Sequence, residues 1–136
     1  MTSNVLTVNG GRPLRGTITV RGAKNFVSKA MVATLLGDSP SVLRNVPDIR
    51  DVTVVSGLLD LHGVQVENVG DGEWHFDPSN VEQAHVADIS LHAGASRIPI
   101  LFCGPLLHKL GEAFIPDLGG CRIGDRPIDY HLRVLE

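Results

Sequence analysis

Residues 22–37 read GAKNFVSKAMVATLLG, and this stretch predicts the first helix of the chain. Gly37 and Pro40 end the pattern, and Asn25 is expected to cap the first turn. The apolar side chains recur at a spacing that suits a largely buried helix. They are Phe26, Val27, Ala30, Met31, Ala33, Leu35 and Leu36, with Thr34 among them.

Strands are expected on both sides of this helix. Residues 5–8 and 14–20 are rich in β-branched side chains and predict two strands joined by a turn at Gly10 to Pro13. Downstream, the patterns predict strands over residues 42–46, 64–67 and 73–76, and a helix over residues 52–62 that ends at Gly63.

The last third of the chain carries similar signals. Residues 88–92 alternate polar and apolar side chains and predict a strand. A helix is expected from Ser96 and Arg97 to Leu110, with Pro99 in its first turn and Gly111 after its end, followed by a short strand over residues 113–115. The mixture of elements predicts an α/β fold of the α+β type.

Two parts of the chain form an internal repeat. Ile18–Val20 matches Ile89–Leu91, which is a period of 71 residues (89 − 18), and Lys24 falls near Arg97. The repeat units cover about residues 17–70 and 88–136. The second unit stops inside a helix that should begin at Pro127, so we expect the chain to be a truncated form of a longer protein.

Composition restricts the class of protein. The chain has 136 residues, 43% hydrophobic and 20% charged, which is typical of one globular domain. A net charge of −3 argues against nucleic acid and anionic membranes as partners. No apolar run approaches the roughly 20 residues of a membrane span, and no signal peptide is evident, so we expect a cytoplasmic protein.

The most distinctive pattern is LGGCRIGDRPID at residues 118–129. Three glycines around Cys121 allow the backbone to approach a ligand closely, and Arg122 and Arg126 would favour the thiolate. The pattern fits a reactive cysteine, and it also fits a buried structural cysteine in a tight turn. Cys103 lies among apolar residues and is interpreted as a packing residue. The cysteines and histidines show no metal-ligand spacing, and we assign neither a metal nor a cofactor.

Basic residues stand at three predicted helix starts: Lys24 beside Asn25, Arg97 after Ser96, and Arg126 before Pro127. Free N–H groups and the helix dipole favour an anion at such places. The three could converge on one phosphorylated ligand, although each is individually compatible with a solvated surface charge.

Two neighbouring polar groups also leave alternatives open. Asp129 and His131 could bind a hydroxyl or a base edge, or they could be a helix-start carboxylate and a surface imidazole. The charges of residues 48–51 are interpreted as a solvated turn with a helix cap.

In order along the chain, these motifs resemble the family of UDP-N-acetylglucosamine 1-carboxyvinyltransferases. The resemblance covers essentially the whole chain, and its last motif is the most specific. The matching stretches are Gly22–Asn25, Asn45–Val52, Ser96–Arg97, Gly104–Leu106 and Gly119–His131.

The resemblance implies a fold and a domain organisation. The family is built of repeated βαβαββ units in an inside-out α/β barrel, here truncated. Residues 1–20 would be strands that pair with a missing second domain, and residues 21–136 would be an incomplete first domain. A domain without its neighbouring unit exposes apolar surface, so self-association is expected.

The resemblance also implies a function, namely transfer of the enolpyruvyl group of phosphoenolpyruvate to the 3-hydroxyl of UDP-N-acetylglucosamine with release of phosphate, in peptidoglycan and cell-wall synthesis. Cys121 would be the catalytic residue and the target of the covalent inhibitor fosfomycin. The substrate-binding residues would be Lys24, Asn25, Arg97, Arg126, Pro127, Asp129, Tyr130, His131 and Leu132.

Two other functions are alternatives to this one, namely a related transferase and a non-catalytic module. The enolpyruvyl transferase of the shikimate pathway lacks the cysteine and carries Lys-Ser where this chain has Lys24-Asn25, so both positions argue against it. A non-catalytic module that binds a nucleotide sugar or assembles with a partner is the alternative from another class. We expect the chain alone to be inactive, because the second domain's carboxylate base and arginines have no counterpart in it.

Overall fold

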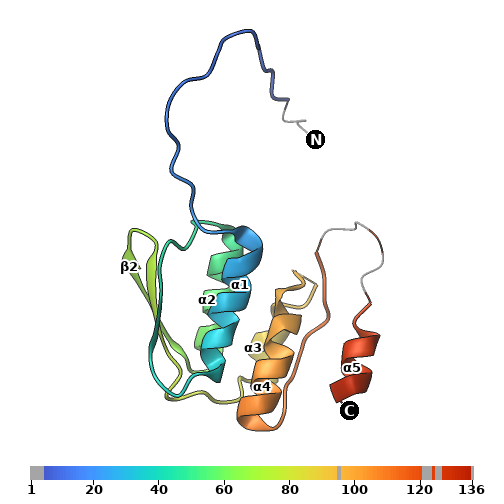
Figure 1. The fold of residues 1–136 in the computed structure, drawn as a ribbon. Coiled ribbons are helices and arrows are strands. Elements are labelled where there is room, and N and C mark those ends of the chain that lie inside the picture. The colour runs from blue at the N-terminus through green and yellow to red at the C-terminus, as the bar shows by residue number, and fades with distance from the viewer. Residues whose placement is uncertain (1–4, 95, 121–123, 125–126, 136) are drawn as a thin grey trace.

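A computed structural model gives the fold and describes residues 5–94, 96–120, 124 and 127–135. Helices α1 (Lys24–Ala33) and α2 (Arg50–Leu61) lie side by side next to a small antiparallel sheet (Figure 1). Its three strands are β1 (Ser41–Leu43), β2 (Gln65–Gly70) and β3 (Glu73–Asp77). They lie in the order β1-β3-β2, so β3 is the central strand. The chain is therefore a mixed α/β structure, as predicted.

The central strand of the sheet sets its register. Phe76 of β3 lies opposite Ser41 of β1 on one side and Val66 of β2 on the other, and its side chain is fully buried. An irregularity between Asn68 and Gly70 precedes the tight turn of the β2–β3 hairpin, where Asp71 and Gly72 have positive φ. Alternation places Phe76 and the partly buried Trp74 of β3 on the same face of the sheet, and both pack in or against the core.

The core lies between α1, α2 and this sheet, and the second half of the chain adds to it. The 3-10 helix η2 (Ile98–Phe102) continues directly into α4 (Cys103–Leu110), and its Phe102 is buried beside the α1 and α2 side chains. The buried core residues are Val27, Met31, Val32, Leu35, Val46, Val52, Val55, Leu58, Leu59, Val64, Phe76, Phe102 and Leu106. Cys103 is also buried, as its apolar neighbours predict.

Most helix predictions are confirmed, with shifts at their ends. The first helix runs over α1 and a closing 3-10 turn, η1 (Thr34–Leu36), but Asn25 is not its cap: Ala23 occupies that position without a side-chain hydrogen bond. Pro99 lies in the first turn of η2, and Gly111 follows α4 with φ +80°. A residue with that φ is usually glycine, which explains why α4 ends there.

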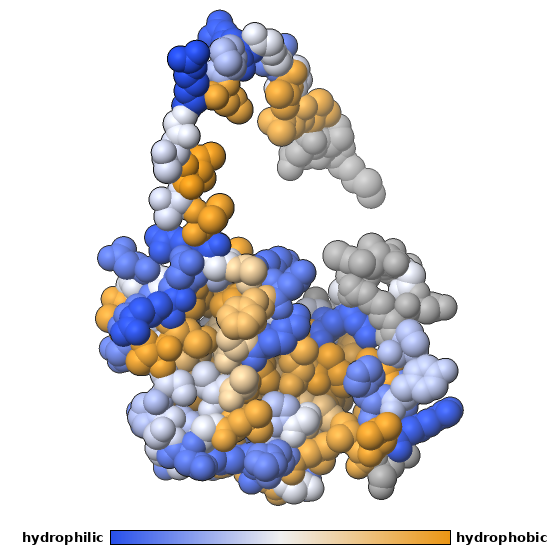
Figure 2. Space-filling model, in the orientation of Figure 1, coloured by the Kyte–Doolittle hydropathy of each residue, from blue (hydrophilic) through white to orange (hydrophobic). Residues whose placement is uncertain are grey.

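The strands predicted at residues 5–8 and 14–20 are not formed in the described part of the chain, and their pairing with a second domain stays a prediction. Residues 5–20 run as an exposed segment away from the folded body, and their apolar side chains stand clear of it (Figure 2). A strand needs a neighbour for its backbone N–H and C=O groups. No strand in the described part of the chain pairs with this segment.

Two further strand predictions are wrong. Residues 88–92 overlap a short helix, α3 (Val86–Ser90), in which Ile89 is buried while Leu91 beyond its end is exposed. One buried side chain in five residues is compatible with one helical turn as well as with a strand, so the alternation of polar and apolar residues was ambiguous. Residues 113–115 form no strand with any other described residues, although Ala113 and Ile115 pack against the core.

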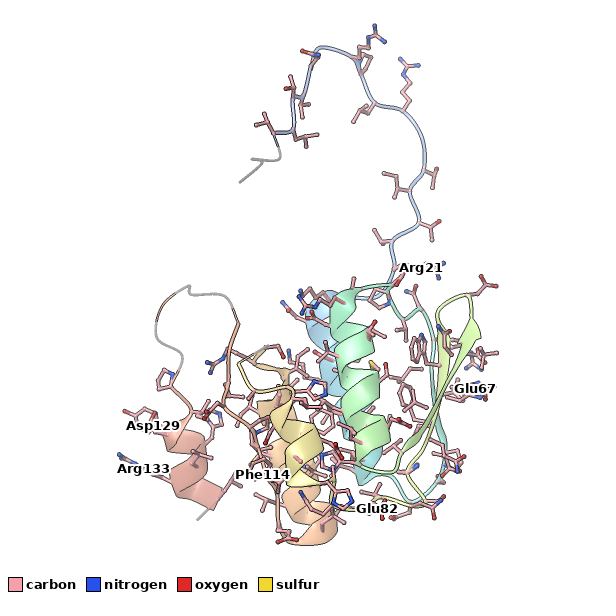
Figure 3. The ribbon with its side chains drawn as sticks, turned by 180° about the vertical axis from the view of Figure 1, so that it is seen from behind. Arg21, Glu67, Glu82, Phe114, Asp129 and Arg133 are labelled. Atoms are coloured by element: carbon pink, nitrogen blue, oxygen red, sulfur yellow. The ribbon has the colours of Figure 1, made fainter. Side chains whose placement is uncertain are left out.

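The last helix, α5 (Asp129–Leu135), lies at the side of the molecule opposite the β2–β3 hairpin (Figure 3). It confirms the helix predicted near residue 127, and none of its described side chains is buried. Arg21 marks the junction at which the exposed N-terminal segment joins the body. Its Nη1 donates a hydrogen bond to the Asp71 carbonyl at 3.1 Å.

Candidate active site

A cleft of about 440 Å³ opens between the start of α1, the start of α2 and the turn before η2. It brings together three of the side chains that the sequence singled out, namely Lys24, Asn25 and Arg97. The remaining lining residues are Ser28, Lys29, Asp51, Ser96, Ile98, Ile100, Leu101 and Gly120. Segments more than 70 positions apart in the sequence therefore share one cavity.

Close backbone approach holds the α1 side of the cleft in place. The Gly22 N–H donates to the Asn45 carbonyl at 2.9 Å, and an added Cβ at Gly22 would lie 2.5 Å from that oxygen. Asn45 itself has a φ of +60°. A side chain at position 22 would clash with this carbonyl, so glycine is needed for the backbone contact. That contact fixes the turn that presents Lys24 and Asn25.

An ion pair crosses the cleft between the two helices. Lys24 Nζ lies 3.3 Å from Asp51 Oδ2, and the side chains are 64% and 30% exposed. Asp51 stands in the first turn of α2, where a carboxylate also interacts favourably with the helix dipole. An exposed pair of this kind stabilises the fold little, so its main effect is to orient the ammonium group.

The opposite wall is built from the turn that precedes η2. Ser96 Oγ accepts a hydrogen bond from the Ile98 N–H at 3.2 Å, and the Ser96 carbonyl accepts one from the Gly119 N–H at 3.0 Å. Arg97 follows as the residue before the first turn of η2. The cleft thus has three cationic side chains (Lys24, Lys29 and Arg97) and one carboxylate (Asp51), which favours an anionic ligand.

The structure does not bring every predicted site residue to this cleft. Asp129, Tyr130, His131 and Leu132 lie on α5, and none of them lines it. Pro127 precedes that helix and does not line the cleft either. Cys121 and Arg126 lie outside the described residues, and their roles stay predictions.

Three polar side chains of the cleft were not predicted as site residues. Asp51 was interpreted as part of a solvated turn, but it pairs with Lys24, and the cap of α2 is Ile49. Ser28 and Lys29 lie about one turn beyond Lys24 and Asn25 on α1, so the spacing of four residues was the available signal. Among the described residues, Lys29 forms no ion pair, which leaves its charge available to a ligand.

The described residues were compared with what a metal site or a membrane span requires. Within the described ranges, no three His, Cys, Asp or Glu side chains are grouped to hold a metal ion. None of the helices seen there is long and apolar enough to cross a membrane.

The architecture and the cationic cleft fit one class of protein. The family model described as EPSP synthase (3-phosphoshikimate 1-carboxyvinyltransferase) matches residues 8–136, and the chain belongs to that family.

Within this family, the chain is similar to proteins named UDP-N-acetylglucosamine 1-carboxyvinyltransferase. It is 45% identical over 131 residues to the one from Gluconacetobacter diazotrophicus and 43% identical over 131 residues to the one from Acidiphilium cryptum. It is 41% identical over 129 residues to UDP-N-acetylglucosamine 1-carboxyvinyltransferase 3 of Caldanaerobacter subterraneus subsp. tengcongensis. These matches cover 95–96% of this chain and 30–31% of the relatives, so the chain spans less than a third of their length.

Proposed function

We propose that the protein to which this chain belongs transfers the enolpyruvyl group of phosphoenolpyruvate to the 3-hydroxyl of UDP-N-acetylglucosamine, the first committed step of peptidoglycan synthesis. The observation that carries the proposal is the cleft in which Lys24, Asn25 and Arg97 meet. These residues come from two distant segments, and both segments match the transferase motifs. The names of the relatives agree with the proposal.

The chemistry requires charge stabilisation more than covalent work by the protein. The sugar 3-hydroxyl loses its proton to the second domain's carboxylate base as its oxygen bonds to C2 of phosphoenolpyruvate, and C3 gains a proton, which gives a tetrahedral intermediate. The C2–O bond to phosphate then breaks, C3 loses a proton, and inorganic phosphate leaves. Lys24 and Arg97 would hold the phosphate, whose negative charge increases on departure.

The other roles are proposed on the resemblance. Cys121 would act as acid or covalent partner and would be the residue that fosfomycin alkylates. Arg126 would add a third cation at the phosphate. Asn25 would bind the sugar, and the residues from Pro127 to Leu132 would contact the uridine part of the nucleotide. On this proposal α5 carries nucleotide recognition while the cleft carries phosphate recognition.

The same proposal extends to the fold of the whole protein. The units at residues 17–70 and 88–136 would belong to an inside-out barrel of repeated units, and residues 1–20 would pair with a second domain. The exposed apolar side chains of residues 5–20 support this arrangement, because a free segment gains stability by burying them. A location in the cytoplasm and self-association of the isolated chain are part of the proposal.

The decisive experiment is covalent labelling. We would treat the chain with fosfomycin, with and without UDP-N-acetylglucosamine, and locate the adduct by peptide mass mapping. An adduct on Cys121 that increases with the sugar nucleotide is expected, whereas Cys103 is buried and serves as the internal control. Lys24→Ala should reduce the labelling of Cys121, and Cys121→Ser should abolish it.

Other outcomes would point elsewhere. Labelling of Cys121 and Cys103 at equal rates would contradict a site at Cys121, because only general thiol reactivity would remain. Binding of UDP-N-acetylglucosamine without labelling would favour the non-catalytic nucleotide-sugar module.

A further inference from the structure

The chain crosses itself next to the cleft. After α4 it runs back alongside that helix (Figure 1) and meets the segment that leads to Arg97. The Gly94 N–H donates to the Asp117 carbonyl at 2.8 Å, and the Gly119 N–H donates to the Ser96 carbonyl at 3.0 Å. Two backbone hydrogen bonds in opposite directions therefore tie Asp117 and Gly119 to Gly94 and Ser96.

The crossing leaves no room for a side chain at position 119. A Cβ added there would lie 1.7 Å from the Gly94 oxygen, which is far inside van der Waals contact. The obstacle is backbone, so a rotamer change cannot relieve it. Gly119 is required for the two segments to approach as closely as they do.

The next residue contacts the arginine itself. Gly120 lines the cleft, and its φ of +106° is a conformation that other residues rarely adopt. A Cβ added to Gly120 would meet Arg97 Cγ at 3.4 Å and Arg97 N at 3.7 Å. The backbone of Gly120 thus lies next to the stem of the Arg97 side chain, and a substitution at this positive φ strains the backbone at that contact.

We infer that Gly119 and Gly120 are positioning residues for Arg97: the first allows the crossing, and the second holds the arginine stem so that its guanidinium faces the cleft. The role of Arg97 in anion binding rests on the proposed function, whereas the positioning rests on the contacts above. Residue 120 directly precedes Cys121 in the sequence. The arginine and the cysteine would therefore depend on the same pair of glycines.

The test compares two glycines of equal backbone strain. Gly120→Ala places a methyl group against Arg97, whereas Gly70→Ala imposes the same strain at φ +108° with nothing within 4 Å. We would titrate the chain and both variants with inorganic phosphate and follow the Arg97 side-chain Nε–H resonance by NMR. Gly120→Ala should move that resonance and weaken phosphate binding at least about fivefold, since a charged hydrogen bond is lost or displaced.

The control should separate positioning from loss of stability. Gly70→Ala should lower the thermal midpoint about as much as Gly120→Ala does, yet leave the Arg97 resonance and the phosphate affinity unchanged. An unchanged resonance and affinity in Gly120→Ala would overturn the inference. So would equal losses of affinity in the two variants, because strain alone would then account for them.

A second measurement keeps the inference independent of the proposed function. If the unmodified chain binds no phosphate, the proposed role of the cleft fails for this chain, but the Arg97 resonance still reports its position. Hydrogen exchange at the Gly94 and Gly119 amides then tests the crossing, and Gly120→Ala should leave both protected while it shifts Arg97. Unprotected amides in the unmodified chain would contradict the crossing itself.

Discussion

Residues 17–84 and residues 86–135 carry similar sequence signals but form different structures. The first region contains every strand in the described part of the chain and most of the core, whereas the second contributes helices that pack against it. Ile18–Val20 and Ile89–Leu91 were matched as one strand of a repeat, yet the first is extended and exposed and the second overlaps helix α3. The difference teaches that alternation produces a strand only where a partner strand is within reach.

The largest expected contrast is in stability. Phe76 is 0% exposed at the centre of the sheet, and Phe76→Ala should destabilise the chain by about 3–5 kcal/mol through lost burial and a cavity. Val134 on α5 is 85% exposed, and Val134→Ala should change stability by less than about 0.5 kcal/mol. Urea unfolding followed by circular dichroism measures both, and similar losses would break the comparison between the two regions.

Two helix-ending glycines sharpen the comparison. Gly63 after α2 and Gly111 after α4 have φ values of +78° and +80°, but a Cβ would lie 2.3 Å from the Asn80 oxygen at Gly63 and meet nothing within 4 Å at Gly111. Gly111→Ala should therefore cost only the backbone strain of about 1–2 kcal/mol. Gly63→Ala adds a backbone clash and should cost about 1 kcal/mol or more beyond that, again measured by urea unfolding. Equal losses of stability would mean that the backbone at Asn80 moves to make room for the added methyl group at position 63.

A buried histidine should make the first region sensitive to acid. His62 is 2% exposed, its ring stacks on Phe102, and its Nδ1 lies 3.2 Å from the Glu82 carbonyl. Burial lowers the pKa of His62, and the hydrogen bond to Glu82 opposes this only in part. The unfolded chain then binds a proton more readily, so this contribution is complete above about pH 6.5 and is lost as the pH falls through and below that value.

The pH effect can be isolated between pH 7.5 and pH 5.0, above the range in which the carboxylates with lowered pKa values, Asp38, Glu73 and Asp77, take up protons. His62→Gln should reduce the loss of stability over this interval, by at most about 1.4 kcal/mol per pH unit. An unaltered slope in His62→Gln would show that another group causes the acid sensitivity.

The smallest effect is expected where the two regions are joined by charge. Lys109 Nζ of α4 lies 2.8 Å from Asp38 Oδ1 and donates to the Gly37 carbonyl at 3.0 Å. This partner lowers the pKa of Asp38, but the carboxylate is almost fully exposed and water competes for it. Asp38→Asn should therefore leave the unfolding midpoint within experimental error, and a clear drop would mean that the regions are held together by this contact.

Helices were more predictable than strands, and the reason is physical. The helix signals are local. Gly111 ends α4 through its own positive φ, and Pro99 favours the first turn of η2 through its own ring, so neither signal depends on a distant residue. The strands predicted at residues 64–67 and 73–76 are confirmed as β2 and β3, because a short hairpin provides each with its partner. Residues 5–8, 14–20 and 88–92 have the same alternation without a partner in the described chain, and the sequence does not reveal that lack.

The candidate site was predictable to a similar extent. Lys24, Asn25 and Arg97 stand at helix starts, and the structure places them in one cleft. Asp51 was missed because its partner Lys24 is 27 positions away (51 − 24), and no local pattern marks an ion pair between helices. The crossing of Gly94 and Gly119 was missed for the same reason, since a run of glycines does not indicate what it touches.

The exposed N-terminal segment has a consequence for proteolysis. Arg12 and Arg15 lie in a chain without secondary structure, which is the form that a protease accepts most readily. Arg21 is held by its bond to the Asp71 carbonyl, and the Gly22 N–H is engaged by Asn45. Limited digestion with trypsin should therefore cut first after Arg15, since Pro13 protects the bond after Arg12, and should slow at Arg21, leaving the folded body with its cleft intact.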